Sequence, residues 1–180
     1  QRHLPDKADW TQVGDDINGD APGDFLGQSV AMSADGNRIV AGAPPTGIGH
    51  GYVRVFQRLN DSWEQFGNDI YGGSEFVAMS ANGNRIMVTD FFAEGYVRVF
   101  DEPAEGSSSS DWTRIGDDII GRSFSLAMSA DGSRIATGGL NDPVRVFDQP
   151  PTGSTAWIQI SNFIAKLFIF YSTGITADGK

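Results

Sequence analysis

One seven-residue motif occurs three times in the sequence, and this repeat restricts the fold more than any other feature. The copies span residues 33–39, 80–86 and 129–135, and a shorter echo at 176–180 closes the sequence. All four tryptophans fall at one phase of the repeat, about 50 residues apart: Trp10, Trp63, Trp112 and Trp157. A period of this length is typical of proteins that stack similar supersecondary units. We therefore expect an array of such units.

Each repeat contains four short segments that are predicted to be strands. In the first repeat they are residues 10–17, which begin with the tryptophan, and residues 29–33, 38–41 and 53–56. The tryptophan segment alternates apolar and polar residues, as a half-buried strand does. Four antiparallel strands in about 50 residues match one blade of a β-propeller. The predicted fold is therefore all-β, with about three and a half propeller blades in a partial or open propeller.

The repeat divides the chain into a leader and four units. The predicted bounds are 1–9 for the leader, 10–62, 63–111 and 112–156 for three blade repeats, and 157–180 for a truncated, degenerate fourth repeat. Closed propellers have about four to eight blades. We therefore expect either a fragment of a longer repeat protein or edge-to-edge association of two copies.

Three polar connections lie between the fourth strand of one repeat and the tryptophan of the next. They span residues 57–62, 101–111 and 148–156 and are rich in Gly, Ser, Pro and acidic residues. This composition is typical of solvated loops. We expect them to lead from one blade to the next and to carry no chemistry.

The repeated motif itself is predicted to be a hairpin turn. Its centre is an Asp-Gly or Asn-Gly pair between two apolar runs, the strongest short-range signal for a two-residue hairpin. The pairs are Asp35 and Gly36, Asn82 and Gly83, and Asp131 and Gly132. Because a one-residue shift would turn every side chain to the other face, such a turn sets the register of its strands.

Arginines recur as regularly as the apolar residues. One set follows the turn, at Arg38, Arg85 and Arg134, and a second set lies inside the fourth strand, at Arg54, Arg98 and Arg145. A ring of guanidinium groups could bind carboxylates or sulfated sugars. Periodicity favours a structural role, because a ligand site rarely needs the same residue in every blade. We expect these arginines to pair with repeat carboxylates such as Asp35, Asp131 or Asp16.

The tryptophans and the methionines at repeat phase are predicted to pack between blades. The methionines are Met32, Met79 and Met128. Both histidines, His3 and His50, lack an evident partner for general-base work or metal binding. The acidic pairs Asp15-Asp16 and Asp117-Asp118 lie at turn phase, so they too are interpreted as structural and not as a glycosidase pair.

The repeats resemble the FG-GAP repeats that form the β-propeller of integrin α chains and of many secreted adhesion-type proteins. The first copy carries the resemblance, with residues 25–27 near the Phe-Gly position and Gly42, Ala43 and Pro44 as the Gly-Ala-Pro. The other copies have Val88-Thr89-Asp90 and Gly138-Gly139-Leu140 at the latter position. A WD-repeat propeller is the weaker alternative, since residues 129–148 are similar to half of such a blade.

FG-GAP blades often hold calcium in a loop of alternating oxygen ligands, and this chain has one similar spacing. The candidate ligands are Asp16, Asn18, Asp20 and Asp24. Calcium takes six to eight oxygens, which such a loop can supply. The loop has Ala21 where the pattern has glycine and lies before the Phe-Gly position, so a polar turn is the competing interpretation. No other cofactor is expected.

Charge and composition exclude several classes of partner. The formal net charge is -10, with 13 basic residues and no Lys/Arg cluster, so nucleic acid is not expected as a partner. The most apolar run, residues 163–175, contains Lys166 and is shorter than the roughly 20 residues of a membrane span. No basic segment followed by an apolar one opens the sequence, so we expect a signal peptide to be either absent or already removed. The chain contains no cysteine, and residues 60–62 match a glycosylation acceptor pattern.

The sequence therefore predicts a non-catalytic recognition or adhesion module that binds a protein or glycan partner. The resemblance implies an extracellular or cell-surface location. Loops 20–25 and 44–50 are the most irregular and are expected to carry contacts. Two alternatives stay open: a propeller-based enzyme that cleaves glycans, and an intracellular WD-type scaffold.

Overall fold

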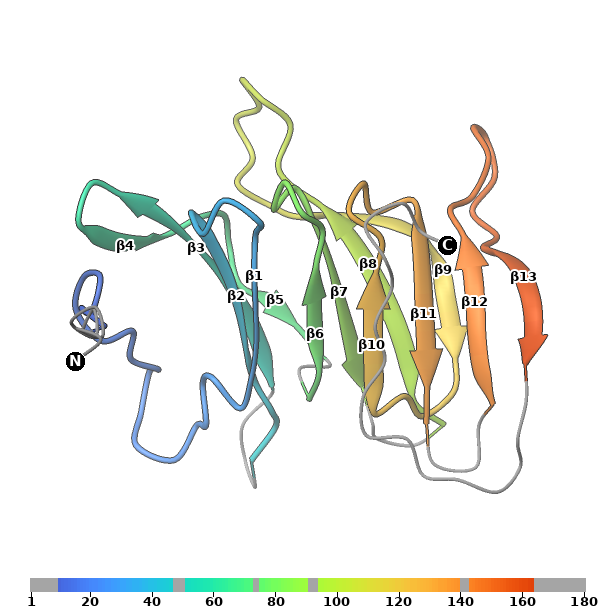
Figure 1. Ribbon diagram of the computed structural model, residues 1–180, viewed down its shortest axis with the longest axis horizontal. Coiled ribbons are helices and arrows are strands. Elements are labelled where there is room, and N and C mark those ends of the chain that lie inside the picture. The colour runs from blue at the N-terminus through green and yellow to red at the C-terminus, as the bar shows by residue number, and fades with distance from the viewer. Residues whose placement is uncertain (1–9, 47–50, 73–74, 91–93, 140–142, 164–180) are drawn as a thin grey trace, which may run out of the picture.

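In the computed structural model the described part of the chain, residues 10–46, 51–72, 75–90, 94–139 and 143–163, forms three antiparallel sheets that stand side by side (Figure 1). It contains strands and turns and no helix. The predicted all-β fold with four-stranded antiparallel sheets is confirmed, and the arrangement is propeller-like. Within the described residues, no helix is long and apolar enough to cross a membrane.

The first sheet has the order β1-β2-β3-β4. Its strands are β1 (Ser29–Met32), β2 (Arg38–Ala43), β3 (Tyr52–Leu59) and β4 (Ser62–Gln65), and the short β5 (Ile70–Tyr71) pairs with the start of β3. The second sheet contains β6 (Val77–Met79), β7 (Arg85–Asp90), β8 (Tyr96–Asp101) and β9 (Thr113–Ile120). The third contains β10 (Ser125–Met128), β11 (Arg134–Gly138), β12 (Val144–Asp148) and β13 (Ile158–Phe163).

The sheets are out of phase with the sequence repeats. Each sheet takes its outermost strand from the tryptophan segment of the next repeat, so that β4, β9 and β13 pair with the strands just before them. The polar connections 57–62, 101–111 and 148–156 therefore close hairpins within a sheet. The prediction that they lead from one blade to the next is wrong. The first tryptophan segment, residues 10–17, forms no strand.

The hairpin turn of the repeat is confirmed, but it is longer than two residues. The backbone N–H of Ser33 donates to Arg38 O, which leaves residues 34–37 as a four-residue loop. Within it the Gly36 N–H donates to Ser33 O, and Gly36 has a φ of 72°. Asp35 is not in the left-handed region, so only glycine supplies the positive φ.

The acidic residue of the turn stabilises the loop locally. The Asp35 carboxylate accepts bonds from the Ser33 hydroxyl at 2.6 Å and from the Asn37 N–H at 3.0 Å. These bonds lower the pKa of Asp35 to about 2. Asp131 has the same arrangement and a pKa lowered to about 2, chiefly by the Ser129 hydroxyl. The turn acids are thus used within the loop, which explains why they are not the arginines' partners.

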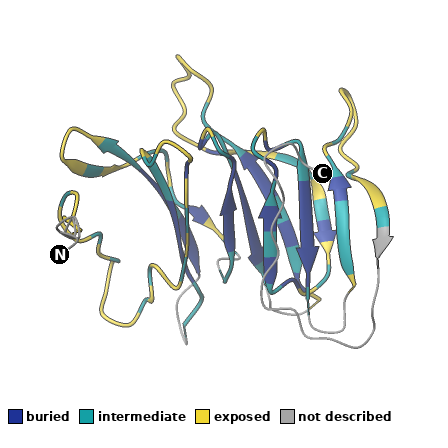
Figure 2. Cartoon of the chain, viewed as in Figure 1, coloured by how far each residue is buried: buried dark blue, intermediate teal, exposed yellow. Residues whose placement is uncertain are grey.

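The buried residues lie mostly on the strands of the three sheets (Figure 2), and apolar side chains packed between neighbouring sheets form the core. One cluster joins the first and second sheets and includes Val40, Val55, Ile86 and Val88, all nearly inaccessible to solvent. A second cluster joins the second and third sheets, and its members are Ala78, Met87, Val97, Val99, Ile119, Ile135 and Phe147. The second sheet is therefore covered on both faces, and burial of this area is the main stabilising term.

The repeated turns bond to one another from sheet to sheet. The Ala34 N–H donates to Ala81 O at 2.8 Å, and the Ala81 N–H donates to Ala130 O at 2.9 Å. Beside them, Arg38 Nη1 donates to Gly83 O at 3.2 Å. Its counterpart in the second sheet, Arg85 Nη1, donates to Gly132 O at 2.9 Å. The motif therefore fixes how neighbouring sheets stack, besides closing its own hairpin.

At the outer edge, two tryptophans bond to the tryptophan segment of the preceding repeat. The indole of Trp112 donates to Phe66 O at 3.3 Å, and that of Trp63 donates to Val13 O at 3.0 Å. A Cβ built on Gly67 would lie 2.6 Å from Nε1 of Trp112, so the tryptophan can approach only because glycine stands there. Packing between sheets is thus confirmed for Trp112, which is buried, and for the partly buried Trp157.

Two residues at repeat phase do not pack as predicted. Trp10 is fully exposed, because no described sheet precedes the first one. Met32 is also exposed, whereas Met79 is buried against the first sheet and Met128 packs against the second. Burial of the repeat residues therefore depends on a neighbouring sheet, which the first sheet lacks on its outward face.

Candidate functional site

Within the part of the chain that the structure describes, five of the six recurring arginines form ion pairs with acidic residues, including all three that follow the turn. After the turn, Arg85 forms a two-pronged pair with Asp101, and Arg134 does the same with Asp148. Arg38 pairs instead with Glu102 of the second sheet at an Nη1–Oε2 distance of 2.6 Å. The expectation of ion pairs is confirmed, but the partners are not Asp35, Asp131 or Asp16. Asp101 and Asp148 are the last residues of β8 and β12, and Glu102 directly follows β8.

The second set of arginines lies on the third strand of each sheet, with Arg54 on β3 and Arg98 on β8, and these two residues pair with acids in the segment that follows a tryptophan. Arg54 binds both carboxylate oxygens of Asp69 at 2.8 Å. These bonds, and those to Asp20, raise the pKa of Arg54, while the Arg54 guanidinium lowers the pKa of Asp69. Arg98 likewise binds Asp118, at 2.7 and 3.1 Å, and lowers the pKa of that carboxyl. Both acids lie six residues after a tryptophan.

Arg145 breaks the pattern. The residue six positions after the last tryptophan is Phe163, so the third sheet has no acid at this phase. Arg145 stands over the ring of Phe147, with 5.6 Å from Cζ to the ring centroid. Within the described chain, its Nε and Nη2 are buried and have no hydrogen-bond partner. A buried donor on a charged group is costly when unsatisfied.

The four predicted calcium ligands have other partners. Asp24 accepts bonds from the backbone N–H groups of Asp20 and Leu26 and from the Tyr52 hydroxyl, at 2.7 Å for the last. The Tyr52 bond is the main reason that the pKa of Asp24 falls to about 2, and burial together with this bond raises the pKa of Tyr52 to about 12. The Asp20 carboxylate pairs with Arg54.

The remaining two candidates bond within the same loop. Asp16 accepts from Gln12 Nε2, and the Asn18 amide donates to the backbone of Asp16. Across the described residues, no group of three or more His, Cys, Asp or Glu side chains is arranged to hold a metal ion. Calcium binding by these four residues stays a prediction, and their present contacts stabilise the loop without it.

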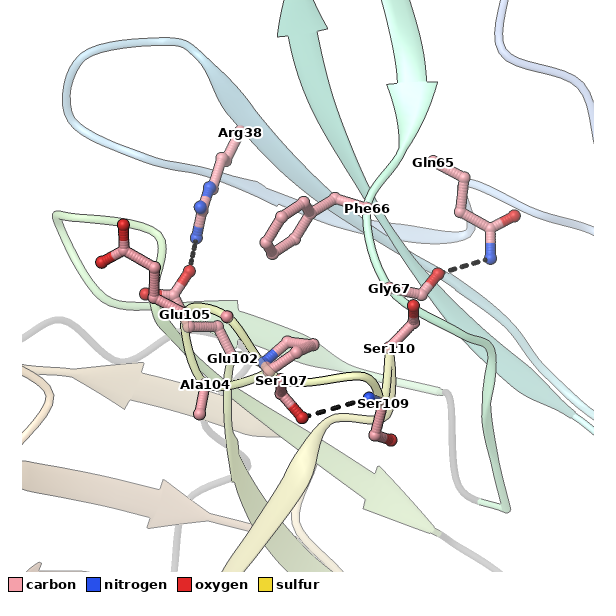
Figure 3. Close-up of a pocket in the computed structure, with 12 residues that line it drawn as sticks. Arg38, Gln65, Phe66, Gly67, Glu102, Ala104, Glu105, Ser107, Ser109 and Ser110 are labelled. Atoms are coloured by element: carbon pink, nitrogen blue, oxygen red, sulfur yellow. Dashed lines mark hydrogen bonds and ion pairs between the residues drawn. The ribbon is translucent and has the colours of Figure 1, made fainter.

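A groove lies between the outer ends of the first and second sheets (Figure 3). Its volume is about 550 Å³. The floor contains Phe66, whose ring is covered on one side by Arg38 at 4.3 Å and touches Trp112 edge-on. One wall is the β8–β9 connection, with Glu102, Glu105 and the serines 107, 109 and 110.

The groove wall was not predicted from the sequence. Residues 101–111 were expected to carry no chemistry, because their Ser, Gly and Pro content is typical of a linker. This connection is longer than its counterparts at 57–62 and 148–156, and that difference between copies is a signal that could have indicated the groove. Of the two loops expected to carry contacts, residues 20–25 hold Asp24 as described, and residues 47–50 lie outside the described residues.

The chain shares its fold with known proteins but not its sequence. No protein-family model matches it, and no curated protein does. A structure of Sqt1 from Chaetomium thermophilum superposes with a TM-score of 0.63 at 15% identity, covering 87% of this chain and 40% of that one. Sqt1 from Saccharomyces cerevisiae gives a TM-score of 0.56 at 12% identity, with coverages of 78% and 36%.

A third neighbour is a proposed 6-phosphogluconolactonase from Bacteroides fragilis, with a TM-score of 0.53 at 14% identity over 78% of this chain and 39% of that one. The chain thus spans less than half the length of each of these three structures. At these identities the likeness concerns the fold alone, and together with the three stacked sheets it is that of a propeller-like scaffold.

Proposed function

We propose that the protein is a non-catalytic recognition module and that the groove between the first and second sheets binds its protein or glycan partner. The observation that carries this proposal is that one wall of the groove consists of residues that are not repeated. Glu105 and the serines belong to connection 101–111, which is longer than its counterparts at 57–62 and 148–156 and differs from them in sequence. Residues that differ between otherwise equal units are free of the packing constraint, so ligand specificity can reside in them.

The groove chemistry supports a polar partner with some apolar surface. An aromatic floor, two carboxylates, a guanidinium and several hydroxyls offer stacking area together with donors and acceptors. Such a mixture suits a sugar ring or a peptide with basic and aromatic residues. The acids considered for glycan cleavage have other bonds, since Asp118 binds Arg98 and Arg114, and Asp117 accepts from Thr155. Recognition is therefore proposed ahead of cleavage.

The proposal includes an open propeller arrangement and a location outside the cell or at its surface. The three sheets are an arc of an open propeller, and the FG-GAP resemblance of the first repeat supports an extracellular or cell-surface role in adhesion. A WD-type scaffold would share the same arc. The exposed outward face of the first sheet supports an open arrangement, because the equivalent faces of the other two sheets are covered.

A charge reversal in the groove wall tests the binding proposal. Arrays of glycans and of displayed peptides are screened with the wild-type chain, and the hits are measured by calorimetry with the Glu105→Lys variant. We expect affinity to fall at least about tenfold, since a lost or reversed polar contact is worth about 1.4 kcal/mol or more. Glu64→Lys, an exposed position on β4 outside the groove lining, is the matched control and should bind like the wild type. Equal affinity of all three proteins would exclude the groove.

A further inference from the structure

We propose that the outward face of the first sheet is a docking surface for the third sheet of a second copy of this chain, with Asp16 of one copy meeting Arg145 of the other. The inference rests on the open arrangement proposed above and is independent of the groove. Three observations carry it: an exposed apolar strand face, the position of residues 10–17, and a complementary pair of charges.

The apolar face is the first observation. Val30 and Met32 on β1 are 61% and 56% exposed. Their equivalents on β6, Val77 and Met79, are 8% and 9% exposed because the first sheet covers them. The sequence thus places the same apolar residues on both strands, and only the neighbouring sheet differs. The face of β1 is built to receive a sheet of the same kind.

The tryptophan segment marks where that sheet would stand. Trp112 donates to Phe66 O, and thereby holds the outer segment of the first sheet against the second. Trp63 donates in the same way to Val13 O, which is the equivalent position three residues after a tryptophan. A Cβ on Gly14 would lie 3.1 Å from Cδ1 of Trp63, again as at Gly67 and Trp112. Residues 10–17 therefore occupy the place of the outer segment of a preceding sheet.

Charge then identifies the sheet that fits. In the first two sheets, an acid six residues after a tryptophan binds an arginine of the neighbouring strand. Asp69 binds Arg54 on β3, and Asp118 binds Arg98 on β8. Asp16 has this phase, and among the described residues it forms no ion pair and accepts only from Gln12. Of the three arginines at the phase of Arg54, Arg145 is the one whose buried Nε and Nη2 have no hydrogen-bond partner among the described residues. A third sheet placed before the first would bring these two residues together.

The strand that now flanks Arg145 is β13, which pairs with β12 from Val144↔Phe163 to Asp148↔Ile158 with a register shift between Val146 and Phe147, so the proposed contact exchanges this ladder for a new one. Among the described residues, all buried side-chain nitrogen and oxygen atoms without a hydrogen-bond partner belong to residues 123–161, at and around the third sheet. Two of them are Nε1 of Trp157, just before β13, and Oγ of Ser161 on β13. In the proposed contact, residues 10–17 of one copy replace β13 of the other beside β12. This exchange would give Arg145 a carboxylate and would bury Val30 and Met32.

Charge-swapped variants test the pairing. Self-association of the wild-type chain is measured by sedimentation velocity up to several hundred micromolar. Asp16→Arg and Arg145→Asp each place like charges in every contact, so each should weaken association at least about tenfold. A 1:1 mixture should associate again, because each copy then finds an opposite charge on both of its neighbours. Val30→Glu should also abolish association, whereas Leu59→Glu, at another exposed apolar position, should not.

The outcomes separate the alternatives. A wild-type chain that stays monomeric over this range overturns the proposal and leaves sheets from outside this sequence as the occupant. Association that the two charge reversals do not weaken, or that the mixture does not restore, overturns the Asp16–Arg145 pairing. Because neither residue lines the groove, partner binding by the groove should be unchanged in these variants, so failure here is distinguishable from failure of the proposed function.

Discussion

Replacing Ile86 by alanine should lower the free energy of unfolding by about 4 kcal/mol, one of the two largest effects expected in this chain. Ile86 is inaccessible to solvent and lies in the cluster between the first and second sheets. The substitution removes buried apolar area and leaves a cavity, because neither sheet can close onto the gap without moving its hairpin turn. Urea unfolding followed by tryptophan fluorescence measures the change.

Ile120 provides the matched control for this substitution. It is also a strand isoleucine of the second sheet, but it is 54% exposed. Ile120→Ala should cost less than about 1 kcal/mol, since little area is buried there. For a chain of this size the Ile86 variant should melt about 10 °C below the wild type. A loss at Ile86 no greater than that at Ile120 would contradict packing between these sheets.

Replacing Gly83 by valine should cost about 3 kcal/mol, the second large effect. Gly83 has a φ of 75°, which costs a residue with a side chain about 1–2 kcal/mol. A Cβ there would also lie 2.7 Å from Cδ of Arg38, a residue of the first sheet. The clash therefore adds an overpacking term to the local strain. Chemical denaturation measures the sum.

Replacing Gly106 by valine separates the cost of the positive φ from the cost of the clash with Arg38. Gly106 has the same φ of 75°, and no heavy atom lies within 4 Å of a Cβ built there. Gly106→Val should therefore show the backbone term alone, about 1–2 kcal/mol. The excess at Gly83 reports the contact with Arg38 across the sheets. If both variants lose equal stability, the turn does not contact the neighbouring sheet as described.

Local sequence signals predicted the strands well, because alternation and hairpin turns act within a few residues. The same signals could not show which strands share a sheet. The segment at Trp63 looks like the start of a unit in the sequence, yet β4 is the last strand of the first sheet. The pairing depends on β3 and β4 being joined by a short hairpin, and a polar loop of this length has the same composition as a linker.

Long-range partners were less predictable than local ones. Arginine pairing followed from periodicity, but Asp35 was a wrong partner, because its carboxylate is already used by Ser33 and Asn37 in its own loop. The partner of Arg38, Glu102, is 64 residues away in the sequence. The groove beside Glu102 could not be predicted either, since its walls come from two sheets that only the stacking brings together.

The central claim is that the repeated motif bonds each sheet to the next, and amide hydrogen exchange of the alanines in the motif tests it most directly. Ala34 and Ala81 lie in turns, where amides usually exchange fast, yet each donates to the alanine carbonyl of the neighbouring turn. We predict that both amides exchange as slowly as those of β2 and β7. Exchange as fast as that of the exposed loop at residues 104–106 would contradict the stacking.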